Sequence, residues 1–435
     1  MLFNYTFKNF RSFKEQASLT MKAGRQRTLE ENLCKVNNYR VLPSAVIYGA
    51  NASGKSNIIM SLAIMKEIVL WGSLEVPSRE INMLELYPFV YNDTQSPMLF
   101  EIEFTNEGFH FIYGFSIMTE KFEHGPRSII SEELTVIQGD KRTKIFERTP
   151  KGVTLMKDKR ALTFIKFETK LLQKFEDKIN INLADTELFL TGAFRSTISN
   201  RLAEAVLDFF KHKLVVVSDF TLKKANLTLF LEDFPDKDLL VWNRILDGFV
   251  KNADFGPQKI AFRPSKKEDK NSSDTELVSI YQSGERKLLL PAELMESRGT
   301  LKLLDFAIPF ETLFSDGGVF VLDEFDAAIH PELIKGIIAL FNDQTLNSSC
   351  AQLIFTTHNP IYLNNKIFRR DQIKFVEKDK DTFESIIFSL ADFGSVDVRN
   401  DQNYLLNYFK GKYGALPFID FSRLLEKEHK HREEE

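Results

Sequence analysis

A glycine-rich segment of eight residues, Gly49 to Ser56, constrains the fold of this chain more than any other part of the sequence. It matches the phosphate-binding pattern G-x-x-x-x-G-K-[ST]. The apolar run at 45–48 is typical of a buried strand, and the pattern at 57–69 is typical of a helix. A strand, a glycine-rich turn and a helix in this order predict a nucleotide-binding P-loop.

The residue types in this loop suit a triphosphate. Glycine at 49 and 54 lets backbone N–H groups approach the phosphates, whose negative charge the helix N-terminus also favours. We expect Lys55 to contact the outer phosphates and the Ser56 hydroxyl to ligate Mg²⁺. The residues predicted to bind the nucleotide are Gly49, Ala50, Asn51, Ala52, Ser53, Gly54, Lys55, Ser56 and Asn57.

Composition and charge narrow the class of protein. The 435 residues suffice for two or three domains, or for one large domain with an insertion. The net charge of −4 gives no overall basic field, so charge does not indicate DNA as a partner, although a local basic stripe stays open. Cys34 and Cys350 lie far apart in the sequence, which argues against a zinc site or a disulfide framework and favours a reducing cytoplasm. With no apolar run of about 18 residues and no signal peptide, we expect no membrane association.

Strand and helix patterns predict three regions. Residues 1–155 form a β-rich lobe with the phosphate-binding loop and a meander. Residues 156–257 form an inserted helical lobe, because apolar residues recur three and four apart around 202–210 and 239–246. Residues 258–435 form a third, C-terminal lobe. The strands expected in the meander cover 98–104, 109–117 and 133–137.

Two apolar strands in the C-terminal lobe end in residues suited to phosphate chemistry. One strand ends at Asp323 and Glu324, where the first acid can hold Mg²⁺ and the second can polarise the attacking water. The other ends at His358, which can sense the γ-phosphate. The candidate metal ligands are therefore Ser56 and Asp323. The candidate catalytic residues are Lys55, Glu324 and His358.

A further segment, 296–300, precedes a helical pattern. Ser297 and Gly299 at this helix N-terminus make a second anion site, which is redundant within one protomer but useful if it closes on a partner's ATP. The alternative is that Ser297 is an ordinary helix cap. A rival segment, Ser283-Gly284, instead reads as a hairpin turn between apolar strands, and Pro291 excludes a helix there.

Together these motifs resemble the ABC-type ATPase heads of the SMC and RecF group. More closely, the chain resembles the compact AAA-like ATPases of bacterial abortive-infection and anti-phage systems of the RloA and AbiL type, related to the heads of the OLD family and of AriA in PARIS. Besides the phosphate loop, the marks of this resemblance are segments 9–13, 296–300, 322–326, 330–331, 356–359 and 408–417.

The resemblance implies an α/β P-loop NTPase fold, namely an ABC-ATPase head with a β-rich N-terminal lobe, a parallel core sheet and a helical insertion. It also implies a homodimer that sandwiches two ATP molecules with Mg²⁺, with a higher oligomer left open. Each phosphate loop then faces Ser297 and Gly299 of the other protomer, while Glu324 is the general base and His358 the switch residue. Two departures are Arg298, where relatives often have Asp, and the Q-loop glutamine, for which Gln95 is one candidate.

By resemblance, the chain is a cytoplasmic ATPase that controls a separately encoded effector, nuclease-like or RNA-targeting, in antiviral defence. Because the stretch after His358 is short, we expect no nuclease module of the kind found in the OLD family. Two alternatives stay open. One is a DNA-repair or DNA-transaction ATPase of the RecF type that grips duplex DNA. The other is a nucleotide-gated scaffold without hydrolysis, against which the intact Lys55, Asp323 and Glu324 argue.

Overall fold

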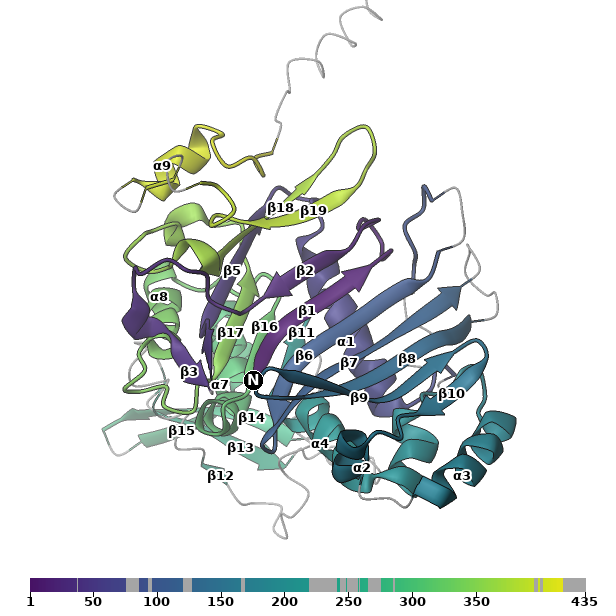
Figure 1. Cartoon of the computed structure of the whole chain (residues 1–435). Helices are drawn as coiled ribbons and strands as arrows, with labels where there is room; N and C mark the ends of the chain where they lie inside the picture. The colour runs from purple at the N-terminus through teal and green to yellow at the C-terminus, as the bar shows by residue number, and fades with distance from the viewer. Residues whose placement is uncertain are drawn as a thin grey trace, which may run out of the picture.

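The molecule is built around two large sheets that lie face to face over a shared apolar layer (Figure 1). The computed structural model describes residues 1–36, 38–75, 86–92, 96–119, 127–165, 169–218, 241–242, 248, 257, 259–264, 275–284, 286–394, 398–399 and 402–417. Within this part of the chain, no helix combines the length and the apolar character that a membrane span requires.

The first sheet is antiparallel and has seven strands in the order β10-β9-β8-β7-β6-β1-β2. Apolar and polar residues alternate in these strands, as expected when one face is buried: Phe100 and Ile102 are fully buried, while Glu101 between them is exposed. The predicted meander is confirmed. The strands are β1 (Leu2–Lys8), β2 (Ala17–Thr20), β6 (Met98–Asn106), β7 (Phe109–Thr119), β8 (Arg127–Gln138), β9 (Lys141–Thr149) and β10 (Gly152–Leu155).

The second sheet has six strands in the order β11-β16-β17-β5-β18-β19, all parallel to their neighbours except β19. Its central strands are continuous apolar runs, because helices or the other sheet cover both faces. The strands are β5 (Ser44–Gly49), β11 (Leu214–Val217), β16 (Val319–Leu322), β17 (Gln352–Thr356), β18 (Ile373–Lys378) and β19 (Ser385–Ser389).

The side chains of β5 contribute to two hydrophobic cores, one on each face of the six-stranded sheet. Ala45 and Ile47 face the core shared with helix α1 (Lys55–Trp71) and the antiparallel sheet. Val46 and Tyr48 face a second core on the opposite side of the sheet. The helices of that second side are α7 (Arg298–Asp316), α8 (Pro331–Asn342) and α9 (Tyr404–Phe409).

One buried side chain joins the two sheets. Gln352, the first residue of β17, accepts a hydrogen bond from the Leu2 N–H at 2.6 Å and donates to the Leu2 carbonyl at 2.9 Å. It also donates to the Leu42 carbonyl at 3.1 Å. The start of β1 is thereby fixed to the six-stranded sheet.

Helical segments cover one end of the antiparallel sheet, where Phe104 stacks on Phe209 with ring centroids 4.1 Å apart. The helical prediction for 202–210 is confirmed. Most of 239–246 lies outside the described residues. At Val241–Trp242 the helical prediction is wrong, because these residues form strand β12 and pair with β13. The boundaries at 155 and 257 stay predictions. The segments are α2 (Lys159–Ile165), α3 (Thr169–Asn182), η3 (Leu190–Ile198), α4 (Asn200–Asp208) and η4 (Phe209–Lys213).

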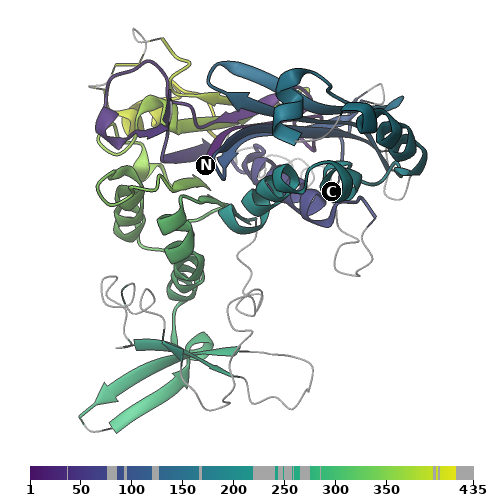
Figure 2. The ribbon, with the colours of Figure 1, turned by 60° about the horizontal axis from the view of Figure 1, so that its bottom comes forward.

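A small antiparallel sheet, β12-β13-β14-β15, stands apart from the rest of the molecule and leads through α7 back into it (Figure 2). The predicted hairpin turn is confirmed, because Ser283 pairs with Arg286 and Gly284 has a φ of 60°. The polar loop expected at 266–274 lies outside the described residues. The elements are β13 (Lys259–Pro264), β14 (Thr275–Ser283), β15 (Arg286–Pro291) and α6 (Ala292–Met295).

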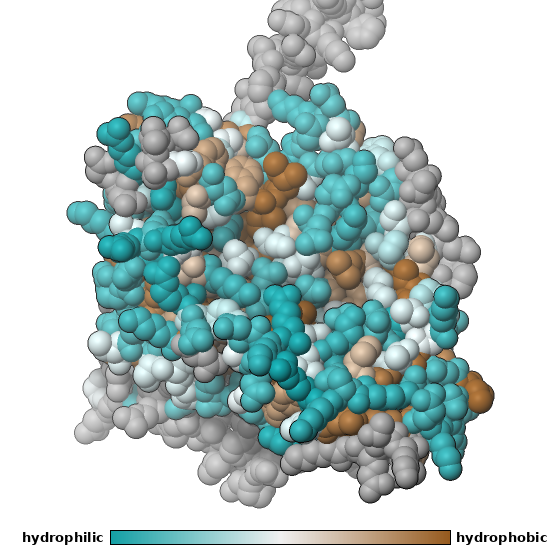
Figure 3. All heavy atoms as spheres, viewed as in Figure 1, coloured by the Kyte–Doolittle hydropathy of each residue, from teal (hydrophilic) through white to brown (hydrophobic). Residues whose placement is uncertain are grey.

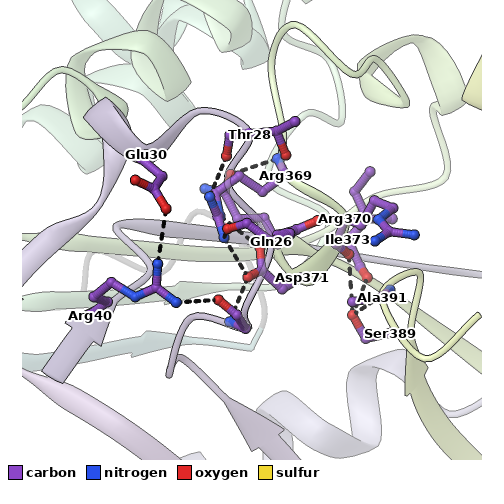
Figure 4. A network of polar contacts seen from close by, with 12 residues as sticks. Gln26, Thr28, Glu30, Arg40, Arg369, Arg370, Asp371, Ile373, Ser389 and Ala391 are labelled. Atoms are coloured by element: carbon purple, nitrogen blue, oxygen red, sulfur yellow. Dashed lines mark hydrogen bonds and ion pairs between the residues drawn. The ribbon is translucent and has the colours of Figure 1, made fainter. Parts of the chain in front are cut away.

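A polar network attaches the loop at 24–28 to the start of β18 (Figure 4). Arg369 is buried and pairs with Asp371 at 3.0 Å, while a second guanidinium nitrogen donates to the Gln26 carbonyl at 3.0 Å. Arg40 donates to the Gly24 carbonyl at 2.7 Å. The short elements not yet named are η1 (Glu30–Asn32), β3 (Cys34–Val36), β4 (Tyr39–Val41), η6 (Pro360–Tyr362) and η7 (Arg370–Gln372).

The two cysteines, distant in the sequence, meet in space. The thiols of Cys34 and Cys350 donate to the same Gln344 side-chain oxygen, at 3.3 and 3.6 Å, and neither cysteine forms a disulfide.

On the face shown in Figure 3, hydrophobic residues occur in small groups separated by hydrophilic ones.

Candidate functional site

The phosphate loop connects the end of β5 to the start of α1. Gly54 caps the helix with a φ of 110°, a backbone conformation that glycine adopts without steric cost. A Cβ at Gly54 would lie 2.7 Å from the Ser385 Oγ and 2.8 Å from the Ser12 Oγ. A Cβ at Gly49 would lie 2.5 Å from the Val376 carbonyl oxygen. Close packing therefore requires both glycines, and the backbone conformation is a second requirement at Gly54.

The loop holds polar groups suited to an anion. The Lys55 ammonium is buried and donates to the carbonyls of Gly49 at 2.8 Å and Ala50 at 3.0 Å. Burial lowers the pKa of Lys55 to about 8, against the opposing effect of nearby carboxylates. The Ser53 Oγ is buried without a hydrogen-bond partner among the described residues. Phosphate oxygens could satisfy both groups, so the loop fits a nucleotide.

Two serines support the loop from segments far away in the sequence. The Ser385 hydroxyl donates to the Ser53 carbonyl at 2.6 Å, and its N–H donates to the Ser12 carbonyl at 2.7 Å. The Asn57 amide donates to the Ser12 Oγ at 2.8 Å. Neither serine was predicted as part of the site, although Ser12 belongs to the 9–13 motif.

The acidic strand end lies two strands away from the loop in the same sheet. Asp323 is buried, and the Thr356 hydroxyl donates to its Oδ1. The same Thr356 oxygen accepts from the Glu324 N–H at 2.7 Å. Glu324 has a φ of 44°, an uncommon conformation for a residue other than glycine. Thr356 thus orients both acids, a role that the sequence analysis missed.

His358 and Glu324 face each other across the ends of β17 and β16. The His358 Nε2 lies 3.6 Å from the Glu324 Oε1, and both side chains are about half exposed. Burial and the Lys55 charge lower the pKa of His358, while Glu324 opposes this shift. The structure therefore brings together Lys55, Asp323, Glu324 and His358, while their individual roles stay predictions.

Ser297 is the N-cap of α7. Its Oγ accepts from the Thr300 N–H at 3.1 Å, so the helix-cap alternative describes its local contact. Ser297 is nonetheless exposed, and a capping hydroxyl at a helix N-terminus remains able to meet an anion. Gly299 is buried, and any Cβ there would collide with the Ala328 carbonyl in the loop after Glu324. The described hydrogen bonds of Ser297 stay within α7, so the chain's own phosphate loop is not its partner.

Lys302 is a second buried lysine at the site, and the sequence analysis missed it. Its ammonium donates to the Glu324 carbonyl at 2.5 Å. Burial lowers the pKa of Lys302 to about 8, although the carboxylates of Asp326, Glu324 and Asp323 oppose this. A lysine inside the mostly apolar pattern 301–307 was the available signal.

The oxygen ligands available at this site, Ser56 and Asp323, suit Mg²⁺ better than a metal ion that is coordinated entirely by protein side chains. No cluster of three or more His, Cys, Asp or Glu side chains occurs in the part of the chain that the structure describes. Ser56 is exposed in the first turn of α1, and Asp323 is buried. Mg²⁺ commonly takes one or two protein oxygens and completes its shell with waters and phosphates. Gln95, the Q-loop candidate, lies outside the described residues.

A phosphate loop after one parallel strand, together with two acids at the end of another strand of the same sheet, defines a P-loop NTPase. A family model described as "AAA domain, putative AbiEii toxin, Type IV TA system" matches residues 44–364, and the chain belongs to this family of AAA-domain proteins. One similar solved structure is the Smc head domain with an extended coiled coil, bound to the C-terminal domain of ScpA, from Pyrococcus furiosus. It is 16% identical with a TM-score of 0.41, and the match covers 89% of this chain and 96% of that chain. A search of curated proteins finds no match.

Proposed function

We propose that this protein binds and hydrolyses ATP with Mg²⁺, and that two protomers share each site. The observation that carries the proposal is the meeting of Lys55, Asp323, Glu324 and His358 at one edge of the parallel sheet. Lysine, a buried acid and an exposed acid are the groups that phosphoryl transfer to water requires.

Each residue has a role that follows from its surroundings. Lys55 exchanges its carbonyl hydrogen bonds for phosphate oxygens and keeps its positive charge beside them. Ser56 and Asp323 would hold Mg²⁺, which neutralises charge on the phosphate oxygens when bound. Glu324 accepts the proton of the attacking water, and His358 contacts the Glu324 carboxylate.

The second half of the site comes from the other protomer. Helix α7 spans 19 residues and begins with an exposed serine and arginine, so its N-terminal N–H groups can face an anion outside the chain. Ser297 and Gly299 then approach the γ-phosphate bound by the partner. ATP binding thus joins two copies, and hydrolysis separates them. Larger assemblies built from such dimers are compatible with this arrangement.

The biological role that we propose is control of a separately encoded effector, nuclease-like or RNA-targeting, in cytoplasmic antiviral defence of the abortive-infection type. Two facts support it: the resemblance to RloA- and AbiL-type ATPases, and the name of the matching family, which refers to a toxin of a toxin–antitoxin system. Dimerisation would hold or release the effector. The test is phage challenge of cells that carry the gene with its neighbours, where a Lys55→Ala variant should abolish protection.

The test of hydrolysis is Glu324→Gln, which removes the base but keeps the side-chain shape. We expect ATP affinity to be retained and turnover to fall roughly 100-fold to 10,000-fold, with ATP-bound dimers accumulating. Phosphate release and light scattering measure the two effects. Glu332→Gln, which changes an exposed glutamate on α8 that pairs with Lys335, is the matched control. Wild-type turnover in Glu324→Gln would remove Glu324 from the role of base.

A further inference from the structure

An aromatic pair stands exposed beside the phosphate loop. The rings of Tyr91 and Phe383 are stacked with centroids 5.3 Å apart and planes 22° apart. Tyr91 is 61% exposed and Phe383 is 44% exposed, whereas most aromatic residues here are buried in the cores. Stacked rings in solvent present a flat apolar surface, which is the type of surface that binds nucleobases.

The backbone at Phe383 indicates that this position is constrained. Phe383 has a φ of 60°, a conformation that is a genuine outlier for a bulky residue. The residue lies between β18 and β19, where its N–H donates to the Asp379 carbonyl at 3.1 Å. Glycine or asparagine would adopt this conformation at lower cost. A strained, exposed aromatic residue is therefore a reason to look for a ligand.

Strand register places Phe383 close to the phosphate loop. Val376 of β18 pairs with Gly49, and two residues later Lys378 pairs with Ser385. Ser385 itself contacts the loop through the Ser53 carbonyl. Phe383 precedes Ser385 by two residues, so their Cα atoms lie at most roughly 7 Å apart.

The 9–13 motif fixes the position of Tyr91. The Asn9 side chain accepts from the Phe89 N–H at 3.0 Å and from the Asn92 amide at 2.6 Å. Three residues further along the same turn, Ser12 contacts Asn57 at the start of α1. One short turn therefore positions both the aromatic segment and the phosphate loop.

The order of strands decides which part of a nucleotide meets this pair. In the order β16-β17-β5-β18-β19, Glu324 and His358 follow strands on one side of the phosphate loop. Phe383 lies two residues before β19, on the other side. A nucleotide whose γ-phosphate reaches Glu324 extends its base away from β16, towards the aromatic pair.

We propose that the Tyr91–Phe383 pair is the platform on which the base of the bound nucleotide stacks, which favours purines because of their larger ring face. This inference rests on the proposed function. Tyr91 presents its ring to the base, while the Lys378 ammonium lies 5.7 Å from the Phe383 ring centroid in a cation–π contact. Specificity for the base thus resides outside the phosphate loop.

Titration calorimetry with ATP, CTP and inorganic tripolyphosphate tests the platform, because tripolyphosphate has no base. We expect Tyr91→Ala and Phe383→Ala to weaken ATP binding roughly 5-fold to 100-fold and CTP binding less. Tripolyphosphate affinity should stay at the wild-type value in both variants. Tyr91→Trp and Phe383→Tyr should restore ATP affinity, because they keep a ring.

Phe409→Ala is the matched control, since Phe409 is 62% exposed on α9 and is expected to leave ATP affinity unchanged. Wild-type ATP affinity in both alanine variants would overturn the platform. An equal loss for ATP and tripolyphosphate would also overturn it, because the effect would then lie in the phosphate loop. Failure of the wild-type protein to bind either compound would instead contradict the proposed function itself.

Discussion

Two regions meet at Glu324, and each brings a buried lysine whose pKa is lowered to about 8. In the phosphate-loop region, Lys55 donates to the carbonyls of Gly49 and Ala50, which belong to the loop that would hold the phosphates. In the α7 region, Lys302 donates to the carbonyl of Glu324 itself. The two lysines are similarly buried but differ in role: Lys55 is placed to bind a phosphate ligand, whereas Lys302 fixes the backbone of Glu324.

The largest effect expected from this difference is that of Lys55→Ala. Loss of the charge beside the phosphates should lower turnover roughly 100-fold to 1,000-fold and abolish tight ATP binding. Phosphate-release kinetics and titration calorimetry measure both. The matched control is Lys66→Ala in the same helix, since Lys66 is partly buried and donates to the Leu214 carbonyl at 2.7 Å. If the two variants lost turnover equally, helix α1 and not the charge would explain the effect.

A second, smaller effect is the pH dependence of ATP affinity, which should depend on Lys55 and not on Lys302. Burial lowers the pKa of Lys55 to about 8, and phosphate charges would raise it on binding. Below pH 8 the ammonium is already charged. Above pH 8 binding must take up a proton, so ATP affinity should fall about 10-fold per pH unit. The slope should persist in Lys302→Met and disappear in Lys55→Met. The same slope in Lys55→Met would assign the titration to another group.

The smallest effect tests whether Ser297, at the start of α7, completes the ATP site of the other protomer. Lys55→Ala protomers and Ser297→Arg protomers should each be inactive alone. Mixed in equal amounts, half of the dimers would be mixed and hold one intact site of two, which gives roughly a quarter of wild-type turnover. Phosphate release before and after mixing measures the recovery. No recovery would mean that Ser297 acts only as the cap of its own helix.

Local features of this molecule were predictable from the sequence, and long-range supports were not. The phosphate loop, the acidic strand end and the hairpin at 275–291 are contiguous, so residue type and spacing identified them. Ser385 supports the phosphate loop from 332 positions away, and Thr356 orients Asp323 from 33 positions away. Contacts of this kind depend on which strands become neighbours, and no spacing rule contains that information. The same limit applies to the two cysteines, whose shared contact with Gln344 needs the folded sheets.

The hydrogen bonds of Gln352 between the two large sheets affect how the molecule can move. Sliding one large sheet over the other would break the two buried hydrogen bonds between Gln352 and Leu2, each at a cost of about 1 to 3 kcal/mol. The two sheets should therefore behave as one stiff body during the ATPase cycle. Because Gly299 at the start of α7 packs against the loop after Glu324, we expect a change near His358 to move α7 and the small sheet that precedes it in the chain.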